Sequence, residues 1–238
     1  MRLDELWPGA EPVCLIAGGW GAELGMRSVF ERFAAPALAE RRAVWLLWDA
    51  AARGPECGPC AERADDPPFF GRPLEIVAWS FGVRLGLEWA ARMRLSVSRF
   101  LAVAGTPWPV DRRLGIAPAV FHGTLEGFDD AKRLAFWRNL TGSADAPMPP
   151  GLERPAEAWR QELLAVKALA AELPPEAQAL LQTLAARKAV AALIPARDRI
   201  VPPAAQRRAW AAAGVPALEL PDEPHLPSAL PGWEALSL

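Results

Sequence analysis

The first residue whose setting could support chemistry is a serine in a predicted tight turn. Ser80 stands at the centre of a small-x-Ser-x-Gly pattern at residues 78–82, between the apolar run Leu74–Val77 and a segment with helical periodicity. A strand–turn–helix of this kind lifts the serine hydroxyl above the sheet. The helix N-terminus adds backbone donors where an oxyanion would develop. The pattern predicts a nucleophile at Ser80, although a serine that only caps a helix can have the same sequence.

A serine hydroxyl of ordinary acidity needs a base, and the sequence has only two histidines, His122 and His225. His225 follows the last predicted strand, and Asp198 follows the strand before it. The chain order serine, aspartate, histidine is used by one large class of hydrolases. Ser80, Asp198 and His225 are therefore predicted to form a catalytic triad, and His122 is assigned to a cap. Taken singly, Asp198 could cap a helix and His225 could be a solvated loop residue.

Two backbone N–H groups are expected to form an oxyanion hole beside Ser80. One belongs to Phe81, the next residue, and the other to Trp20 in the loop Gly18–Gly21 after the first predicted strand. Glycines in that loop let the chain turn back sharply towards the reacting carbonyl. Trp20 and Phe81 are also expected to contact the substrate. A glycine-rich loop can bind a dinucleotide instead, but the spacing here is not GxGxxG.

Short apolar runs, each bounded by turn or helix signals, predict the strands that position these residues. They are Val13–Ala17, Val44–Trp48, Leu74–Trp79, Phe100–Ala104, Val190–Ile194 and Ala217–Leu220. Continuous hydrophobicity is typical of strands buried on both faces. Helices are predicted between several of them, at Ser28–Glu40, Gly82–Met93 and Pro203–Ala213. The alternation predicts an α/β fold with a mostly parallel sheet and helices on both faces, and the candidate site residues fall at the carboxyl ends of its strands.

The chain is expected to form a single domain over residues 1–238, with a helical cap inserted at about residues 111–187. That stretch is too long for one crossover, and it carries an amphipathic pattern at Trp159, Leu163 and Val166. We expect the cap to lie over the sheet without a core of its own. Residues 49–73 have no clear apolar period.

Composition narrows the possible partners and location. The net charge is −2, so no global field favours nucleic acid or an anionic membrane. No apolar run reaches the ~18–20 residues of a membrane helix, and the N-terminus lacks the apolar core of a secretory signal. Three cysteines are too few for a disulfide scaffold. A cytoplasmic protein that binds neither nucleic acid nor membrane is expected.

Cys57 and Cys60 raise an alternative function. Their C-x-x-C spacing copies a thiol–disulfide redox motif and follows a predicted strand. In a thioredoxin-like domain, however, the pair would open a helix directly after the strand, whereas residues 50–56 intervene here. Two incidental loop cysteines are favoured over a thiol–disulfide oxidoreductase.

Several segments together resemble the BioG-type pimeloyl-[acyl-carrier protein] methyl ester esterases, which belong to the α/β-hydrolase superfamily. The resemblance covers most of the chain. It runs through Ala17–Gly21, Val77–Val83, Gly105–Asp111, Gly115–Pro118, Phe121–Leu125, Ala196–Pro203, Gln206 with Arg207, Ala209 and Trp210, and Pro224-His225. The segments between 105 and 125 are the most specific, because generic members of the superfamily do not share them. Residues 144–176 and the loop with Cys57 and Cys60 look divergent.

The resemblance implies an enzyme of biotin synthesis that cleaves the methyl ester of a pimeloyl chain on acyl carrier protein. Ser80, Asp198 and His225 carry over as the triad, and no metal or organic cofactor is implied. Because the carrier is acidic, cap arginines such as Arg133 and Arg138 are expected to dock it. A general short-chain carboxylesterase remains the alternative within the enzyme class, and a binding module without catalysis remains outside it.

Overall fold

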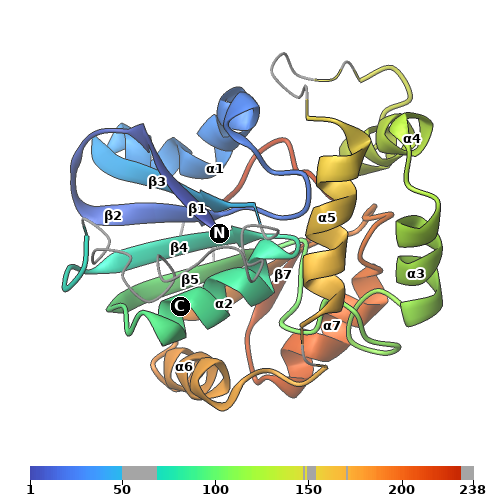
Figure 1. Ribbon diagram of the computed structural model, residues 1–238. Helices are drawn as coiled ribbons and strands as arrows, with labels where there is room; N and C mark the ends of the chain where they lie inside the picture. The colour runs from blue at the N-terminus through green and yellow to red at the C-terminus, as the bar shows by residue number, and fades with distance from the viewer. Residues whose placement is uncertain (50–68, 147, 149–153, 170, 232–238) are drawn as a thin grey trace.

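The computed structural model describes residues 1–49, 69–146, 148, 154–169 and 171–231 (Figure 1). Cys57 and Cys60 lie outside these residues. Within the described part of the chain, no helix is both long enough and apolar enough to cross a bilayer. The same residues include no group of three or more metal-binding side chains.

A seven-stranded sheet with the order β1-β3-β2-β4-β5-β6-β7 forms the centre of the molecule. Its strands are β1 (Arg2–Trp7), β2 (Ala10–Ala17), β3 (Arg42–Trp48), β4 (Leu74–Trp79), β5 (Val97–Val103), β6 (Val190–Pro195) and β7 (Ala217–Leu220). All neighbours pair in parallel except β1, which runs antiparallel to β3. The parallel strands follow the predicted apolar runs. β1 was not predicted, because polar Arg2, Asp4 and Glu5 alternate with apolar residues on this edge strand.

Helices cover both faces of the sheet, as predicted. On one face α1 (Arg27–Ala39) buries Val29, Phe30 and Phe33 against the strands. On the other face lie α2 (Gly82–Arg92), α6 (Pro175–Ala186) and α7 (Pro203–Ala212). Proline opens α6 and α7, at the helical position where a missing N–H costs no hydrogen bond.

Three further helices stand beyond the carboxyl ends of the strands (Figure 1). They are α3 (Pro118–Glu126), α4 (Asp130–Thr141) and α5 (Ala156–Lys167), and together we call them the cap. The side chain of Asp129 accepts a hydrogen bond from the Lys132 N–H and begins α4, and Gly142 ends it with a left-handed backbone. The cap helices pack on Trp20 and Phe81, and these residues together form a hydrophobic cluster distinct from the two that flank the sheet.

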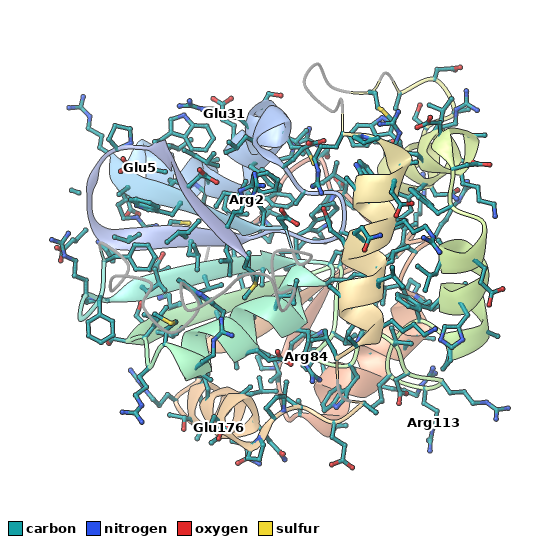
Figure 2. The ribbon with its side chains drawn as sticks, viewed as in Figure 1. Arg2, Glu5, Glu31, Arg84, Arg113 and Glu176 are labelled. Carbon is teal, nitrogen blue, oxygen red and sulfur yellow. The ribbon has the colours of Figure 1, made fainter. Side chains whose placement is uncertain are left out.

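The last helix of the predicted insertion, α6, lies on the sheet beside α2 and not over the strand ends (Figure 1). Arg84 of α2, labelled in Figure 2, links the two layers from a fully buried position. Its guanidinium donates to the carbonyl oxygen of Pro107 at 3.1 Å and to that of Glu172 at 2.8 Å. The helix that follows Ser80 is thereby tied to the loop after β5 and to the segment that enters α6.

Candidate active site

Ser80 lies at the sharp turn between β4 and α2, as the sequence pattern predicts. Its backbone has φ +58°, a left-handed conformation that is rare and strained for a residue with a side chain. The close approach of strand and helix requires Gly82, because a Cβ atom there would lie 2.0 Å from the Ala17 carbonyl oxygen. The turn therefore holds the Ser80 hydroxyl at the carboxyl edge of the sheet.

The three side chains predicted to act together are brought together. His225 Nε2 lies 2.9 Å from the Ser80 hydroxyl oxygen, and His225 Nδ1 lies 2.8 Å from Asp198 Oδ2. All three residues are buried, and His225 has no exposed surface. Because the Asp198 carboxylate can only accept, Nδ1 carries the proton that it donates to Asp198, and Nε2 accepts from the Ser80 hydroxyl. The arrangement can pass a proton from the hydroxyl to the imidazole.

Asp198 is held on both oxygens. Oδ1 accepts from the N–H groups of Ile200 and Val201 at 2.8 and 2.9 Å, and Oδ2 accepts from Gln206 Nε2 at 2.8 Å as well as from His225. Gln206 is completely buried on α7 and also donates to the Val201 carbonyl. The sequence predicted no role in the site for Gln206, because a glutamine inside a helix matches no motif of its own.

The loop that carries His225 is fixed from two sides. The indole N–H of Trp79 donates to the His225 carbonyl oxygen at 2.9 Å. The Leu226 N–H donates to the carbonyl oxygen of Leu140 in α4 at 2.8 Å. The imidazole thus takes its position from β4 on one side and from the cap on the other.

The glycine loop after β2 lies against Ser80. A Cβ atom on Gly19 would sit 2.5 Å from the Ser80 Cβ. Within the described residues, the backbone N–H groups of Trp20 and Phe81 donate no hydrogen bond to another part of the chain. Two unengaged donors, one in the residue after the serine and one in the loop that packs against it, are compatible with an oxyanion hole.

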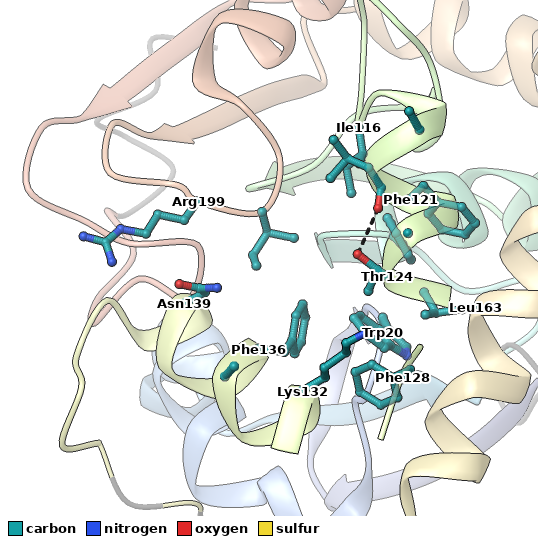
Figure 3. Close-up of a pocket in the computed structure, with 16 residues that line it drawn as sticks. Trp20, Ile116, Phe121, Thr124, Phe128, Lys132, Phe136, Asn139, Leu163 and Arg199 are labelled. Carbon is teal, nitrogen blue, oxygen red and sulfur yellow. Dashed lines mark hydrogen bonds between the residues drawn. The ribbon is translucent and has the colours of Figure 1, made fainter. Parts of the chain in front are cut away.

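A cavity of about 390 Å³ lies between the cap helices (Figure 3). Trp20 and Phe81, the two predicted substrate contacts, form part of its wall. Most of the other lining side chains are apolar and come from the cap and from the loops after β5 and β6; they include Ile116, Val120, Phe121, Phe128, Phe136, Leu163 and Ile200. Such a cavity suits an apolar chain whose reacting group lies beside Ser80.

Polar side chains at the cavity are few, and two are cationic. Lys132 and Arg199 line it together with Asn139 and Thr124 (Figure 3). Both cations are exposed. No sequence pattern marks these two residues as partners, because only the packing of α4 and the loop after β6 brings them to one cavity.

The two arginines predicted to dock a carrier differ in the structure. Arg133 turns inward, donates to the Arg154 carbonyl oxygen at 2.6 Å and pairs with Asp130 at 3.2 Å. Arg138, on the same helix, is exposed. Of the two predicted residues, Arg138 alone therefore presents its charge to solvent.

Behind the glycine loop lies a buried cluster of charges. Arg154 pairs with Glu162 at 2.5 Å and approaches Glu23 at 3.9 Å. Burial raises the pKa of each carboxyl to about 7, and the attraction of Arg154 opposes that rise only in part.

The remaining candidates stand apart from the site. His122 packs its ring against Phe121 in α3, and within the described residues it has no hydrogen bond to Ser80, Asp198 or His225. Cys14 is a buried thiol whose pKa burial raises to about 12, so it is not a nucleophile at neutral pH.

The sheet order, the turn at Ser80 and the cap define an α/β-hydrolase fold. Crystal structures with this fold superpose over almost the whole chain. BioG from Haemophilus influenzae has a TM-score of 0.71 at 24% identity and covers 99% of each chain. The esterase EaEST from Exiguobacterium antarcticum has a TM-score of 0.59 at 12% identity, over 94% of this chain and 87% of its own.

The chain belongs to the BioG family, because the family model described as pimeloyl-ACP methyl esterase BioG matches residues 70–236. Curated relatives match only in part. A malonyl-[acyl-carrier protein] O-methyltransferase from Bacteroides fragilis is 36% identical over 107 residues, which are 43% of this chain and 21% of the relative. An uncharacterized Haemophilus influenzae protein is 36% identical over 100 residues, 41% of this chain and 46% of its own length. The chain thus spans a minor part of both relatives.

Proposed function

We propose that this protein is a serine carboxylesterase that hydrolyses the methyl ester of pimeloyl-acyl carrier protein. The observation that carries the proposal is the continuous hydrogen-bonded path from Ser80 through His225 to Asp198. Phe81, the residue after Ser80, lines an apolar cavity. Membership of the BioG family supports the choice of substrate. No residue in this mechanism requires a metal or an organic cofactor.

In the first half of the reaction, the Ser80 oxygen attacks the ester carbonyl while His225 Nε2 takes the hydroxyl proton. The carbonyl oxygen becomes an oxyanion that accepts hydrogen bonds from the Trp20 and Phe81 N–H groups. When the intermediate collapses, the bond to the methoxy oxygen breaks, and His225 gives the proton to that oxygen to release methanol. Asp198 holds the imidazole tautomer throughout.

In the second half, water attacks the acyl-serine. His225 Nε2 takes a proton from the water, and the resulting oxyanion occupies the same two N–H groups. Collapse breaks the bond to Ser80, and the proton returns to the Ser80 oxygen. The released product is the free carboxylic acid, which then loses its proton to solvent, and the acyl chain is still attached to its carrier at the other end.

The cavity supports an extended acyl chain as the substrate. Its apolar wall favours methylene groups, at about 0.8 kcal/mol for each buried CH₂. Lys132 and Arg199 at the cavity and Arg138 on the outer side of α4 offer positive charge to an acidic carrier. The second candidate function is a general short-chain carboxylesterase. Such an enzyme would use the same triad, and its substrate would have no need of these cations.

The chemistry is tested by Ser80→Ala. Turnover of a methyl ester is expected to fall on the order of 10⁴–10⁶-fold with the fold intact, since the nucleophile is lost while the remaining site still binds. An organophosphate should label Ser80, as read by mass spectrometry of the digested protein. Labelling of another serine, or an alanine variant with near-normal turnover, would remove the proposed nucleophile.

The choice between the two substrates is tested by comparing carrier-linked and free methyl esters of pimelate. The carrier-linked ester is expected to have the higher kcat/KM, and the difference should shrink as salt screens the exposed charges. Arg138→Glu and Arg199→Glu should raise KM for the carrier-linked ester several-fold. The matched control is Arg187→Glu, an exposed arginine after α6 at the opposite edge of the sheet. Equal kcat/KM values at every salt concentration would favour the general esterase.

A further inference from the structure

Helix α5 of the cap contacts the glycine loop at two consecutive residues. The indole N–H of Trp20 donates to the Trp159 carbonyl oxygen at 2.8 Å. The Gly21 N–H donates to Glu162 Oε2 at 2.9 Å. Both bonds are buried and join parts of the chain about 140 residues apart. They restrain the side chain of Trp20 and the peptide group that follows it.

The conformation that these bonds hold is unusual. Gly21 has φ +76°, and a Cβ atom there would lie 2.6 Å from the Trp159 ring. The loop therefore turns directly beneath α5, and its backbone cannot shift towards the helix. Because the Trp20 N–H lies within the restrained segment, its direction depends on contacts made by the cap.

The acceptor of the second bond, the Glu162 carboxylate, is a charged group whose burial costs free energy. Its side chain is 2% exposed, and its charge is balanced from one side by Arg154 at 2.5 Å. Arg154 is itself held by α4, because Arg133 donates to its carbonyl oxygen at 2.6 Å. A buried ion pair adds little net stability compared with apolar residues of the same size. Its value here is directional, since a carboxyl oxygen in a fixed buried position gives the Gly21 N–H one defined acceptor.

We propose that Glu162 is a positioning residue, which aims the Trp20 N–H at the reacting carbonyl by holding Gly21, with Arg154 holding Glu162 in turn. The cap then does more than enclose the acyl chain: it completes the oxyanion hole. This inference rests on the proposed function, because it assumes that an oxyanion forms beside Ser80. Neither Glu162 nor Arg154 touches the substrate.

The test compares Glu162→Leu with Glu162→Gln on a short methyl ester that does not fill the cavity. Outright loss of one oxyanion donor costs about 10²–10³-fold in kcat, so a misdirected donor should cost about 10–100-fold. Glu162→Leu is expected to lose that much kcat with KM within about threefold. Glu162→Gln keeps an oxygen that can accept from Gly21 and should retain most of kcat. Glu157→Leu, which changes an exposed glutamate of the same helix, is the matched control.

A trifluoromethyl ketone separates positioning from a merely structural role. It adds to the serine hydroxyl and places an oxyanion in the hole, so its Ki should rise in Glu162→Leu by the same factor by which kcat/KM falls. A looser fold would instead lower the melting temperature and raise KM. Wild-type kcat and Ki in Glu162→Leu would overturn the inference.

A second variant keeps the test decisive if Glu162→Leu does not fold. Glu162→Asp preserves a carboxylate beside Arg154 but shortens the side chain by one methylene group, which takes the acceptor away from the Gly21 N–H. It is expected to lower kcat about tenfold and raise the Ki of the ketone equally, and wild-type values would again overturn the inference. Failure of the proposed function is distinguishable, because it would appear as an active Ser80→Ala variant.

Discussion

Ser80, Asp198 and His225 each stand on a loop that directly follows a strand, whereas the cavity wall comes mainly from cap helices that are linked to the sheet by long connections. β4 and β6 are held by hydrogen-bonded ladders on both sides, and β7 is held by one ladder to β6, so the loops that follow them inherit a fixed spacing. The cap helices have only side-chain packing and a few hydrogen bonds. The residues proposed for the reaction are therefore positioned by the sheet. The residues proposed for substrate selectivity lie mainly on the cap, where substitutions leave the hydrogen bonds of the sheet intact.

The separation between the two regions is not complete. The Leu226 N–H bonds to α4 beside the histidine, and α5 bonds to the loop that carries Trp20. At these points a change in the cap can reach the chemistry. Substitutions in the two regions should therefore differ in the size of their effect on activity and in whether they change kcat or KM.

The largest effect is expected for His225→Ala compared with His122→Ala. His225 works as one unit with Ser80, so its loss should lower kcat on the order of 10⁴-fold or more. His122 lies on the cap without a bond to the site, and its alanine variant should keep most of the activity. Steady-state kinetics on a soluble methyl ester measures both. If His122→Ala lost activity and His225→Ala kept it, the general base would be His122 on the cap, and the separation of catalytic residues from the cap would be wrong.

An intermediate effect is expected in the cavity wall. Gly123 of α3 lines the cavity, and a Cβ atom there meets nothing within 4 Å. Gly123→Leu should fold, because leucine is a better helix former than glycine, and its side chain should compete with a long acyl chain for space. The ratio of kcat/KM for a seven-carbon ester to that for an acetyl ester should fall about tenfold. An equal loss for both esters would mean that α3 acts on the chemistry and not on chain length.

The sheet and the triad were predictable because their signals are local. The runs before Ser80 and Asp198 form strands that are buried along their whole length, as predicted, whereas β7 before His225 is an edge strand whose residues are exposed or half-buried. The three site residues still follow strands in a recognised order. β1 escaped prediction because one face of an edge strand is polar. Gln206 was missed as a partner of Asp198, because its contact depends on how α7 packs against the preceding loop.

The cap was less predictable, because its contacts join residues far apart in sequence. Arg133 and Arg138 look equivalent in the sequence, yet one turns inward to Arg154 and the other faces solvent. Glu162 resembles any glutamate on an amphipathic helix, and only the folded structure brings it to Gly21. Such roles follow from packing between helices, which no short pattern records.

The smallest expected effect is a change in the free energy of unfolding with pH. It depends on the buried carboxyl of Glu162, which connects the cap to the glycine loop. Burial raises the pKa of Glu162 from 4.5 to about 7; Arg154 and the Gly21 N–H oppose the rise, and Asp49 adds to it. Between about pH 4.5 and 7 the folded protein then holds a proton that the unfolded chain has released. The Glu162 contribution to the free energy of unfolding must therefore decrease as pH rises through that window.

Residue 162 cannot titrate in Glu162→Gln. The free energy of unfolding of this variant, relative to that of the wild type, should therefore increase as pH rises from about 4.5 to 7. The gain is expected to be on the order of 1 kcal/mol, since part of the full shift is lost to relaxation around the charge. Urea unfolding of both proteins at several pH values measures it.

The variant also changes the contact with Arg154, which shifts its free energy of unfolding by the same amount at every pH. Only the part of the difference that varies with pH comes from the proton on Glu162. Above about pH 8, where the carboxylate is ionised in both states, the difference should be constant. A difference that is flat from pH 4.5 upwards would mean that Glu162 is already ionised in the folded protein, with Arg154 outweighing burial; the bond to Gly21 would then carry a full charge at every working pH.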